Sequence, residues 1–123
     1  MFDPKNFPDY ATLEDQGTRI TLLKLDGDPV MEGEKPVTAL VAGVYSGRYR
    51  RAQAALRNKA VRARGNLTGD TLEARQVELD AALVIEWDIA ASRQEVFAED
   101  RFQCLRDQIV EAANNHARFF AKP

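Results

Sequence analysis

Residues 96–120 read VFAEDRFQCLRDQIVEAANNHARFF, and the rest of the chain is interpreted around this stretch. Six of its positions recur at steps of three or four, as on one face of an α-helix, namely Phe102, Leu105, Ile109, Ala112, His116 and Phe120. The preceding residues Ser92–Glu95 form a capping-box pattern, which is typical of a helix start. We therefore predict one helix over residues 93–120, about 40 Å long at about 1.5 Å per residue.

Aromatic residues lie at both ends of this predicted helix, which gives it more apolar surface than one small partner layer easily covers. Two interpretations follow: a helix packed wholly in its own core, or a helix shared between its own domain and another chain. Under the second interpretation, the candidate partner-binding residues are Phe97, Phe102, Leu105, Ile109, Phe119 and Phe120.

The composition is that of an ordinary soluble globular protein. The 123 residues are 45% hydrophobic and 29% charged, which fits a single domain with one modest core. A net charge of −2 argues against a dedicated binder of polyanions. The first ten residues lack the basic start and apolar run of a signal peptide, and the apolar runs are too short to span a bilayer. We therefore expect a cytosolic protein, and its single cysteine excludes an internal disulfide.

The first third of the chain is predicted to contain the strands. Residues 1–17 combine prolines and aromatics and indicate an irregular arm, held to the domain by Phe2, Phe7 and Tyr10. Residues 18–25 and 36–45 are predicted strands, with a short extra strand or flap around residues 30–31. Such a sheet must lie against a helix to be stable in water.

Two further helices are predicted between the strands and the C-terminal helix. The first covers residues 47–64, is capped by Ser46, and contains seven basic residues and no acid: Arg48, Arg50, Arg51, Arg57, Lys59, Arg62 and Arg64. The second covers residues 70–89 and is acidic and apolar, so the two are expected to pair as a helical hairpin. The predicted fold is α+β and mainly α, with a two- or three-stranded antiparallel sheet followed by three helices in a single domain over residues 18–123.

No recognisable catalytic machinery accompanies this pattern. Cys104 and His116 would lie roughly 18 Å apart on one helix, which indicates a packed thiol and a packed imidazole. A metal site needs three or four ligands, which this spacing does not supply. The glycines at 43 and 47 lack the Lys-Ser/Thr of a phosphate-binding loop and indicate a strand-to-helix turn. We expect no catalytic residues, no metal and no cofactor.

The basic helix allows three interpretations. Its charges can form a solvated face paired with the acids of the next helix, a surface for a protein partner, or a site that neutralises phosphates of a nucleic acid. The arginines are distributed around the helix and the next helix supplies many acids, so the ion-paired face is favoured and nucleic acid is the least favoured of the three.

Two short motifs give the sequence a resemblance to a known family. Residues 43–55 read GVYSGRYRRAQAA, and residues 105–112 read LRDQIVEA ahead of a closing RFF at 118–120. In this order, after a strand pair and around a basic and an acidic helix, they resemble tail assembly chaperones of long-tailed bacteriophages. The similarity extends over roughly residues 18–120.

The resemblance implies a non-enzymatic protein of the bacterial host cytoplasm. Chaperones of this family keep the long tape measure protein soluble and help to recruit tail tube subunits, so these two proteins are the implied partners, and homo-oligomers are expected. Two alternatives remain: a small structural tail or connector protein of a phage particle, and a nucleic-acid-binding module that uses the basic helix.

Overall fold

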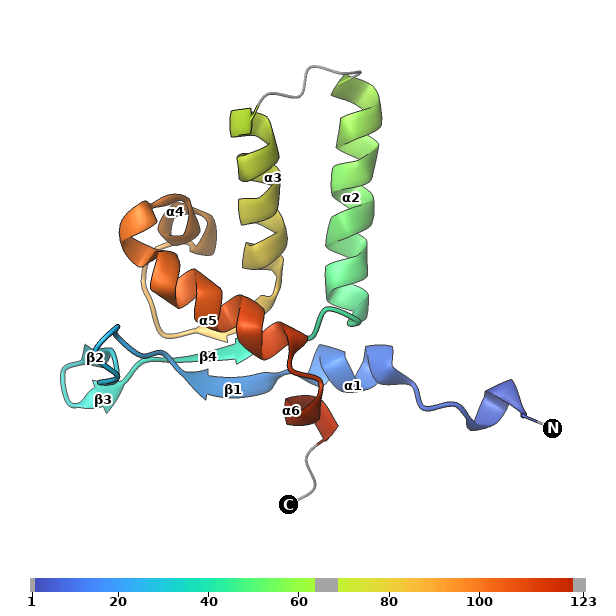
Figure 1. Cartoon of the computed structure of the whole chain (residues 1–123), viewed down its shortest axis with the longest axis horizontal. Coiled ribbons are helices and arrows are strands. Elements are labelled where there is room, and N and C mark those ends of the chain that lie inside the picture. The colour runs from blue at the N-terminus through green and yellow to red at the C-terminus, as the bar shows by residue number, and fades with distance from the viewer. Residues whose placement is uncertain (1, 64–68, 121–123) are drawn as a thin grey trace.

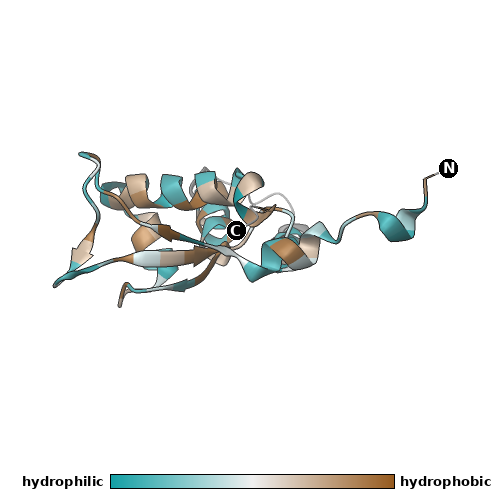
Figure 2. Ribbon diagram, turned by 90° about the horizontal axis from the view of Figure 1, so that it is seen from below, coloured by the Kyte–Doolittle hydropathy of each residue, from teal (hydrophilic) through white to brown (hydrophobic). Residues whose placement is uncertain are grey.

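The structure of the protein is a computed structural model (Figure 1), which describes the backbone of residues 2–63 and 69–120 and the side chains of residues 2–59 and 71–120. It has a mixed α+β fold, in which an antiparallel sheet near the N-terminus is followed by helices. The helix α5 lies across one face of this sheet (Figure 2). The predicted fold class is confirmed, whereas several element boundaries differ from the prediction.

The main sheet is antiparallel throughout and has the strand order β1-β4-β5. Its strands are β1 (Thr18–Thr21), β4 (Thr38–Val41) and β5 (Val84–Trp87). On the helix-covered face, Ala39 and Val41 are fully buried. On the opposite face, the guanidinium of Arg19 in β1 lies 3.0 Å from the carboxylate of Glu86 in β5. The two predicted strands are therefore present in shortened form, and β5 completes the sheet.

A small ribbon separates β1 from β4. It consists of β2 (Met31–Glu32) and β3 (Lys35–Pro36), and it confirms the short extra strand predicted around residues 30–31. Gly33 turns the chain between them with a φ of +62°, a left-handed conformation that glycine adopts readily. The backbone N–H of Val30 donates to the carbonyl of Leu22, so the ribbon continues from the end of β1.

The basic helix is confirmed as α2 (Gly47–Ala63), and it pairs with α3 (Gly69–Ala82) as the predicted helical hairpin (Figure 1). The hydroxyl of Ser46 accepts the backbone N–H of Tyr49 at 3.1 Å, as expected of a cap. The predicted extension of the second helix to residue 89 is wrong, because residues 84–87 pair with β4. β-Branched and aromatic side chains favour this extended conformation.

The prediction of a single helix over residues 93–120 is also wrong. Four shorter elements replace it: α4 (Arg93–Ala98), η2 (Asp100–Phe102), α5 (Gln103–Asn114) and α6 (Ala117–Phe120). The start is as predicted, since the Ser92 hydroxyl accepts the N–H of Glu95 at 3.2 Å. The helical conformation stops at Glu99 (φ −94°, ψ 128°) and again at Asn115 (φ −90°, ψ 86°). The first break turns Phe97 into the core, where its ring meets Trp87 edge-on at a centroid distance of 5.6 Å.

Residues 1–17, predicted to be irregular, contain two helical segments among those that the structure describes. These are the turn η1 (Pro4–Asn6) and the helix α1 (Tyr10–Gln16). The Asp9 carboxylate accepts the N–H of Thr12 at 3.1 Å and caps α1, and Gly17 ends the helix with a φ of +81°. Residues 2–9, here called the N-terminal arm, are all exposed and run away from the body of the protein (Figures 1 and 2).

The core lies between the sheet, α3, α4 and α5. Its buried apolar residues come from nearly every element, namely Leu22, Val37, Ala39, Val41, Val77, Ala81, Leu83, Val84, Val96, Phe97, Leu105, Ile109, Ala112 and Ala113. The alternating pattern of the strand and the three-to-four spacing of the helix meet here, since alternate residues of β4 contact the apolar face of α5.

Candidate interaction surface

The predicted partner-binding residues do not form one surface. Three of them lie in the core: Phe97, Leu105 and Ile109. The other three are partly exposed: Phe102, Phe119 and Phe120. Because the break at Glu99 folds α4 back against α5, the apolar seam between them is covered within the chain. The prediction that Phe97, Leu105 and Ile109 bind a partner is therefore wrong.

Exposed aromatic side chains gather instead along the N-terminal arm and at the start of α1, where α1 meets α6. Phe2 and Phe7 are 68% and 58% exposed, and their rings touch edge-on at 6.1 Å. Phe7 contacts Tyr10 at 5.4 Å, and Tyr10 contacts Phe120 of α6 at 5.0 Å. We call these four residues the terminal aromatic cluster. Tyr10 joins it to the domain, whereas the predicted anchoring of Phe2 and Phe7 to the domain is wrong.

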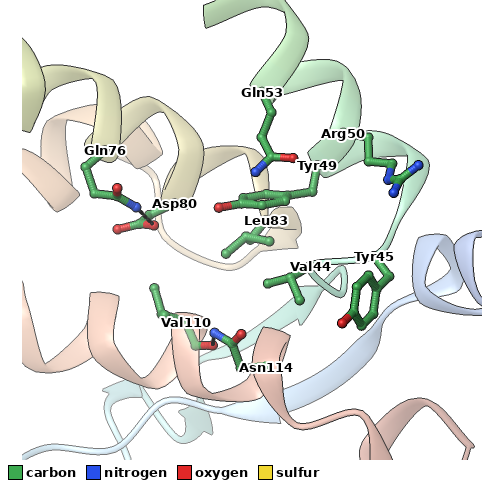
Figure 3. A pocket seen from close by; sticks show the side chains of 10 residues that line it. All are labelled: Val44, Tyr45, Tyr49, Arg50, Gln53, Gln76, Asp80, Leu83, Val110 and Asn114. Carbon is green, nitrogen blue, oxygen red and sulfur yellow. Dashed lines mark hydrogen bonds between the residues drawn. The ribbon is translucent and has the colours of Figure 1, made fainter. Parts of the chain in front are cut away.

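A hollow of about 460 Å³ lies beside this cluster, between the base of the α2–α3 hairpin and α5 (Figure 3). We call it the α2–α5 groove. Its lining residues are Val44, Tyr45, Tyr49, Arg50, Gln53, Gln76, Asp80, Leu83, Val110 and Asn114. Figure 3 shows Val44, Leu83 and Val110 pointing into the space, with Tyr49 above them and Asn114 below. Apolar side chains with polar groups around them are typical of sites that bind another molecule.

The groove continues toward the N-terminal arm. A second hollow, of about 470 Å³, is lined by residues of the arm and α1 on one side and by Tyr45 and Arg50 on the other. These two residues also line the α2–α5 groove, so the two hollows adjoin. Tyr45 is 55% exposed, and its ring is therefore available at the junction.

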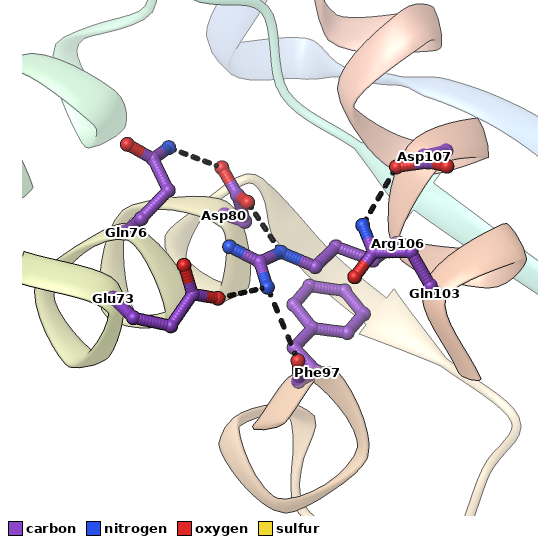
Figure 4. Close-up of polar contacts among 7 residues, drawn as sticks. All are labelled: Glu73, Gln76, Asp80, Phe97, Gln103, Arg106 and Asp107. Carbon is purple, nitrogen blue, oxygen red and sulfur yellow. Dashed lines mark hydrogen bonds and ion pairs between the residues drawn. The ribbon is translucent and has the colours of Figure 1, made fainter. Parts of the chain in front are cut away.

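An ion network centred on the buried side chains of Arg106 and Asp80 adjoins the groove, which Asp80 and Gln76 also line (Figure 4). Arg106 of α5 donates to Asp80 and to Glu73 of α3, each at 2.7 Å, and to the carbonyl of Phe97 at 3.3 Å. Gln76 donates to the second oxygen of Asp80 at 2.9 Å. Burial opposes the charge of Arg106, but its hydrogen bonds to Glu73 and Asp80 outweigh that effect and raise its pKa. Asp80, the carboxylate among the residues that line the groove, is thus paired with Arg106, which it shares with Glu73.

This network also affects the tyrosine on the groove wall. Burial, followed by the negative charge of Asp80, raises the pKa of Tyr49 above its ordinary value. Tyr49 therefore keeps its proton at neutral pH and offers a hydroxyl as a hydrogen-bond donor to anything that enters the groove.

A second buried carboxylate positions Tyr45. Glu14 is fully buried, and its Oε1 accepts the backbone N–H of Tyr45 at 2.9 Å. Its Oε2 lies 3.3 Å from Nδ1 of His116, and the imidazole in turn stacks on the Tyr45 ring at 4.9 Å. Gly43 leaves the room that this carboxylate fills, since a Cβ there would overlap it. Glu14 and His116 hold the groove's entrance residue from two sides.

The basic residues of α2 have several different surroundings. Arg48 is directed inward and donates to the carbonyls of Ala82 and Val84. Lys59 lies 3.6 Å from Glu78 of α3. The remaining described members are exposed along the helix: Arg50, Arg51 and Arg57. Among the described side chains, the ion pairing between the two helices is therefore sparser than predicted. The side chains of Arg62 and Arg64 lie outside the described residues.

Cys104 and His116 do not share a metal site with further ligands in the described part of the chain. Cys104 is a half-buried free thiol on α5, and His116 pairs with Glu14. Within the part of the chain that the structure describes, no group of three or more potential metal ligands occurs. Over the same residues, no helix is long and apolar enough to cross a membrane.

Comparison of the chain with protein families, curated proteins and solved structures finds no match. The candidate surface therefore rests on the geometry of this chain. The sequence predicted the strand-to-helix turn at residues 43–47, but it did not identify most of the residues that form this surface. The sequence signal that could have revealed this surface is the pair Tyr45 and Tyr49, which flank the Ser46 cap. Two aromatic residues at the start of a basic helix are unusual, and tyrosine is enriched in interfaces.

Proposed function

We propose that this protein is a non-enzymatic tail assembly chaperone of a long-tailed bacteriophage, which binds the tape measure protein in the host cytoplasm and helps to recruit tail tube subunits. The observation that carries the proposal is where the two family-like motifs lie. Five residues of the groove come from the GVYSGRYRRAQAA motif: Val44, Tyr45, Tyr49, Arg50 and Gln53. Val110 comes from the LRDQIVEA motif. Both motifs thus contribute to one open groove.

The chemistry of the groove supports the choice of an amphipathic helix as the client. Its apolar floor and tyrosine wall suit the apolar stripe of an amphipathic helix. The exposed guanidinium of Arg50, with Arg51 and Arg57 farther along α2, favours acidic residues beside that stripe. A tape measure protein, as a long amphipathic helix, offers such stripes repeatedly.

Co-expression with the tape measure protein of the same phage tests the proposal. Tyr49→Asp and Val110→Asp place a charge at the groove wall, and each should move the tape measure protein from the soluble to the insoluble fraction. Leu25→Asp is the matched control, because Leu25 is 92% exposed and belongs to the β1–β2 connection at the far end of the protein. Circular dichroism should show that all three variants fold. Equal solubility of the tape measure protein with all variants would contradict the proposal.

Two observations favour other functions, and each has its own test. The terminal aromatic cluster also suits a permanent contact in a particle, so a structural tail protein predicts the chain in purified virions, from which a chaperone is absent. The exposed Arg50, Arg51 and Arg57 favour nucleic acid as a weaker candidate. Binding to a labelled duplex would then weaken steeply with salt, because each neutralised phosphate releases a counterion.

A further inference from the structure

We propose that the N-terminal arm of one copy of this protein occupies the α2–α5 groove of a second copy, and that two copies exchange arms reciprocally as a symmetric dimer. The partner in this interaction is the chain itself, so the inference stands independently of the proposed chaperone function. It accounts for an exposed aromatic segment and an open groove that lie side by side.

The arm is built to bind something beyond its own chain. Phe2 and Phe7 remain 68% and 58% exposed, although phenylalanine gains most from burial. Pro4 and Pro8 restrict the backbone, so little conformational entropy is lost when the arm binds. Asp9 caps α1 and thereby fixes the direction in which the arm leaves the body (Figure 1).

The groove matches the arm in size and offers apolar contacts within a largely polar lining. A cavity of about 150 Å³ holds one benzene ring, so the groove of about 460 Å³ has room for two phenyl groups. The rings of Phe2 and Phe7 already touch edge-on at 6.1 Å and can enter as a pair. They would meet the apolar side chains of Val44 and Val110 and the ring of Tyr49.

The charges of the two surfaces are complementary. The arm carries Asp3 and Asp9 against a single Lys5, and is therefore acidic. Arg50 lies on the groove rim, next to the exposed Arg51, while the carboxylate in the groove, Asp80, is only 4% exposed and pairs with Arg106. The exposed charges at this part of the rim are thus positive, which favours the acidic side chains of the arm there.

The position of the groove favours exchange between copies. Tyr45 and Arg50 line both the groove and the hollow at the base of the arm, so each chain has its arm and its groove on one side. A two-fold axis near these residues places each arm beside the groove of the partner. Residues 2–8 span at most roughly 23 Å when extended, which covers such a crossing. Insertion into the arm's own groove would instead require the arm to turn back from the direction in which it leaves the body (Figure 1).

Sedimentation equilibrium on the full chain is the first test. The wild-type chain should dimerise at tens of micromolar or below. Phe2→Ala and Phe7→Ala should each raise the dimer dissociation constant by roughly tenfold or more, since each removes a buried phenyl group. Leu25→Ala removes an even more exposed apolar side chain far from the arm and should leave the constant unchanged. A monomeric wild-type chain, or a dimer that is indifferent to Phe2→Ala and Phe7→Ala, would overturn the proposal.

A charge exchange shows whether the contact joins two copies. Asp3→Arg and Arg50→Asp should each weaken dimerisation by roughly threefold or more, because like charges then face each other. An equimolar mixture of the two variants should recover the wild-type constant, because both arm–groove contacts of the mixed dimer pair opposite charges. Insertion of each arm into its own groove predicts no recovery on mixing, and that result would overturn the exchange. Urea unfolding of each variant shows that its fold is retained.

Discussion

Glu14 is a fully buried carboxylate, and burial of a charge is costly unless hydrogen bonds compensate for it. Its compensation is local: the N–H of Tyr45 binds one oxygen and His116 lies beside the other. The backbone also takes part, because the N–H of Gly43 donates to the carbonyl of Glu14 at 3.1 Å. One residue therefore ties α1 to the turn before α2 and to the start of α6, the three segments that surround the groove entrance.

Gly43→Ala tests this arrangement. A Cβ at Gly43 would overlap the Glu14 carboxylate, which the surrounding structure prevents from moving away. We expect a loss of about 1–3 kcal/mol in the free energy of unfolding, as is typical of overpacked sites. Gly47→Ala is the milder comparison, because a Cβ there would lie 2.9 Å from the Asp15 carboxylate and 3.0 Å from the Arg51 guanidinium, without the overlap found at Gly43. A small shift of Asp15 would weaken only its hydrogen bonds from the N–H groups of Gly47 and Arg48. Equal effects of the two substitutions in urea unfolding would contradict the steric explanation.

Arg106→Met is expected to be among the most destabilising single changes in the chain. It leaves Asp80, which is only 4% exposed, without its cationic partner. Removal of one member of a buried ion pair typically costs about 3–5 kcal/mol. Arg101→Met is the matched control: Arg101 lies 3.5 Å from Glu99 at the surface, where such pairs contribute about 0–1 kcal/mol.

The double variant Asp80→Leu with Arg106→Met separates the loss of the ion pair from the cost of leaving an unpaired charge buried. Because no buried charge then remains at this position, we expect it to recover most of the stability lost by Arg106→Met. Urea unfolding gives the free energy of unfolding of the wild type, the two single variants and the double variant. A double variant that is less stable than Arg106→Met would show that the pair itself supplies the stability.

At the scale of elements, Gln108 joins α5 to the end of β1. Its amide accepts the N–H of Leu23 and donates to the carbonyl of Leu23, both at 2.7 Å, as a neighbouring strand would. Gln108→Ala should therefore speed hydrogen exchange at residues 22–25 and lower the free energy of unfolding by about 1–2 kcal/mol. Glu111→Ala, an exposed position on the same helix, should change neither quantity. Unchanged exchange in Gln108→Ala would contradict this role.

The sheet has a pH-sensitive contact at the end of β5. Hydrogen bonds from the backbone N–H and then the hydroxyl of Thr38 lower the pKa of Asp88 below its ordinary value of 3.8. The pKa of Asp88 is therefore lower in the folded than in the unfolded protein. Its hydrogen bonds stabilise the fold fully at a pH above the unfolded-state pKa, and this stabilisation is lost as the pH falls through the folded-state pKa. The stability difference between wild type and Asp88→Asn should therefore shrink in acid. A difference that stays constant with pH would contradict this.

The elements that depend on local signals could be predicted from the sequence, and those that depend on distant pairing could not. Ser46 and Ser92 cap their helices as expected, and the strands before residue 45 follow their composition. β5 was missed because its apolar residues continue the spacing of α3, and its conformation is decided by pairing with β4. The break at Glu99 has the same origin, since burial of Phe97 against Trp87 outweighs helical continuity.

The candidate surface could be predicted only in part. The basic helix and the turn before it were identified, but the groove also needs Leu83 after α3 and Val110 on α5. Segments far apart in the sequence meet there, and spacing along one helix does not reveal that. The α1 start at Asp9 and stop at Gly17 were local signals that the aromatic and proline content obscured.

At the scale of the whole molecule, the two proposals concern the same groove and therefore predict competition. If the arm of a second copy fills the groove, a client helix binds only to chains whose groove is free. The apparent dissociation constant for the client then equals the intrinsic constant divided by the free fraction. A labelled tape measure segment should thus bind more weakly as the wild-type chain is concentrated above its dimer constant.

The arm variants provide the decisive comparison for this competition. Phe2→Ala with Phe7→Ala keeps the groove free at all concentrations, so it should bind the same segment at least as tightly as dilute wild type, without the loss at high concentration. Fluorescence anisotropy measures both chains, with Leu25→Ala as a control that should follow wild type. Client binding that is equally tight for wild type and the arm variant above the dimer constant would place the client and the arm on different surfaces. In that case the tyrosines of the groove would serve self-association, and the client would bind at another surface of the protein.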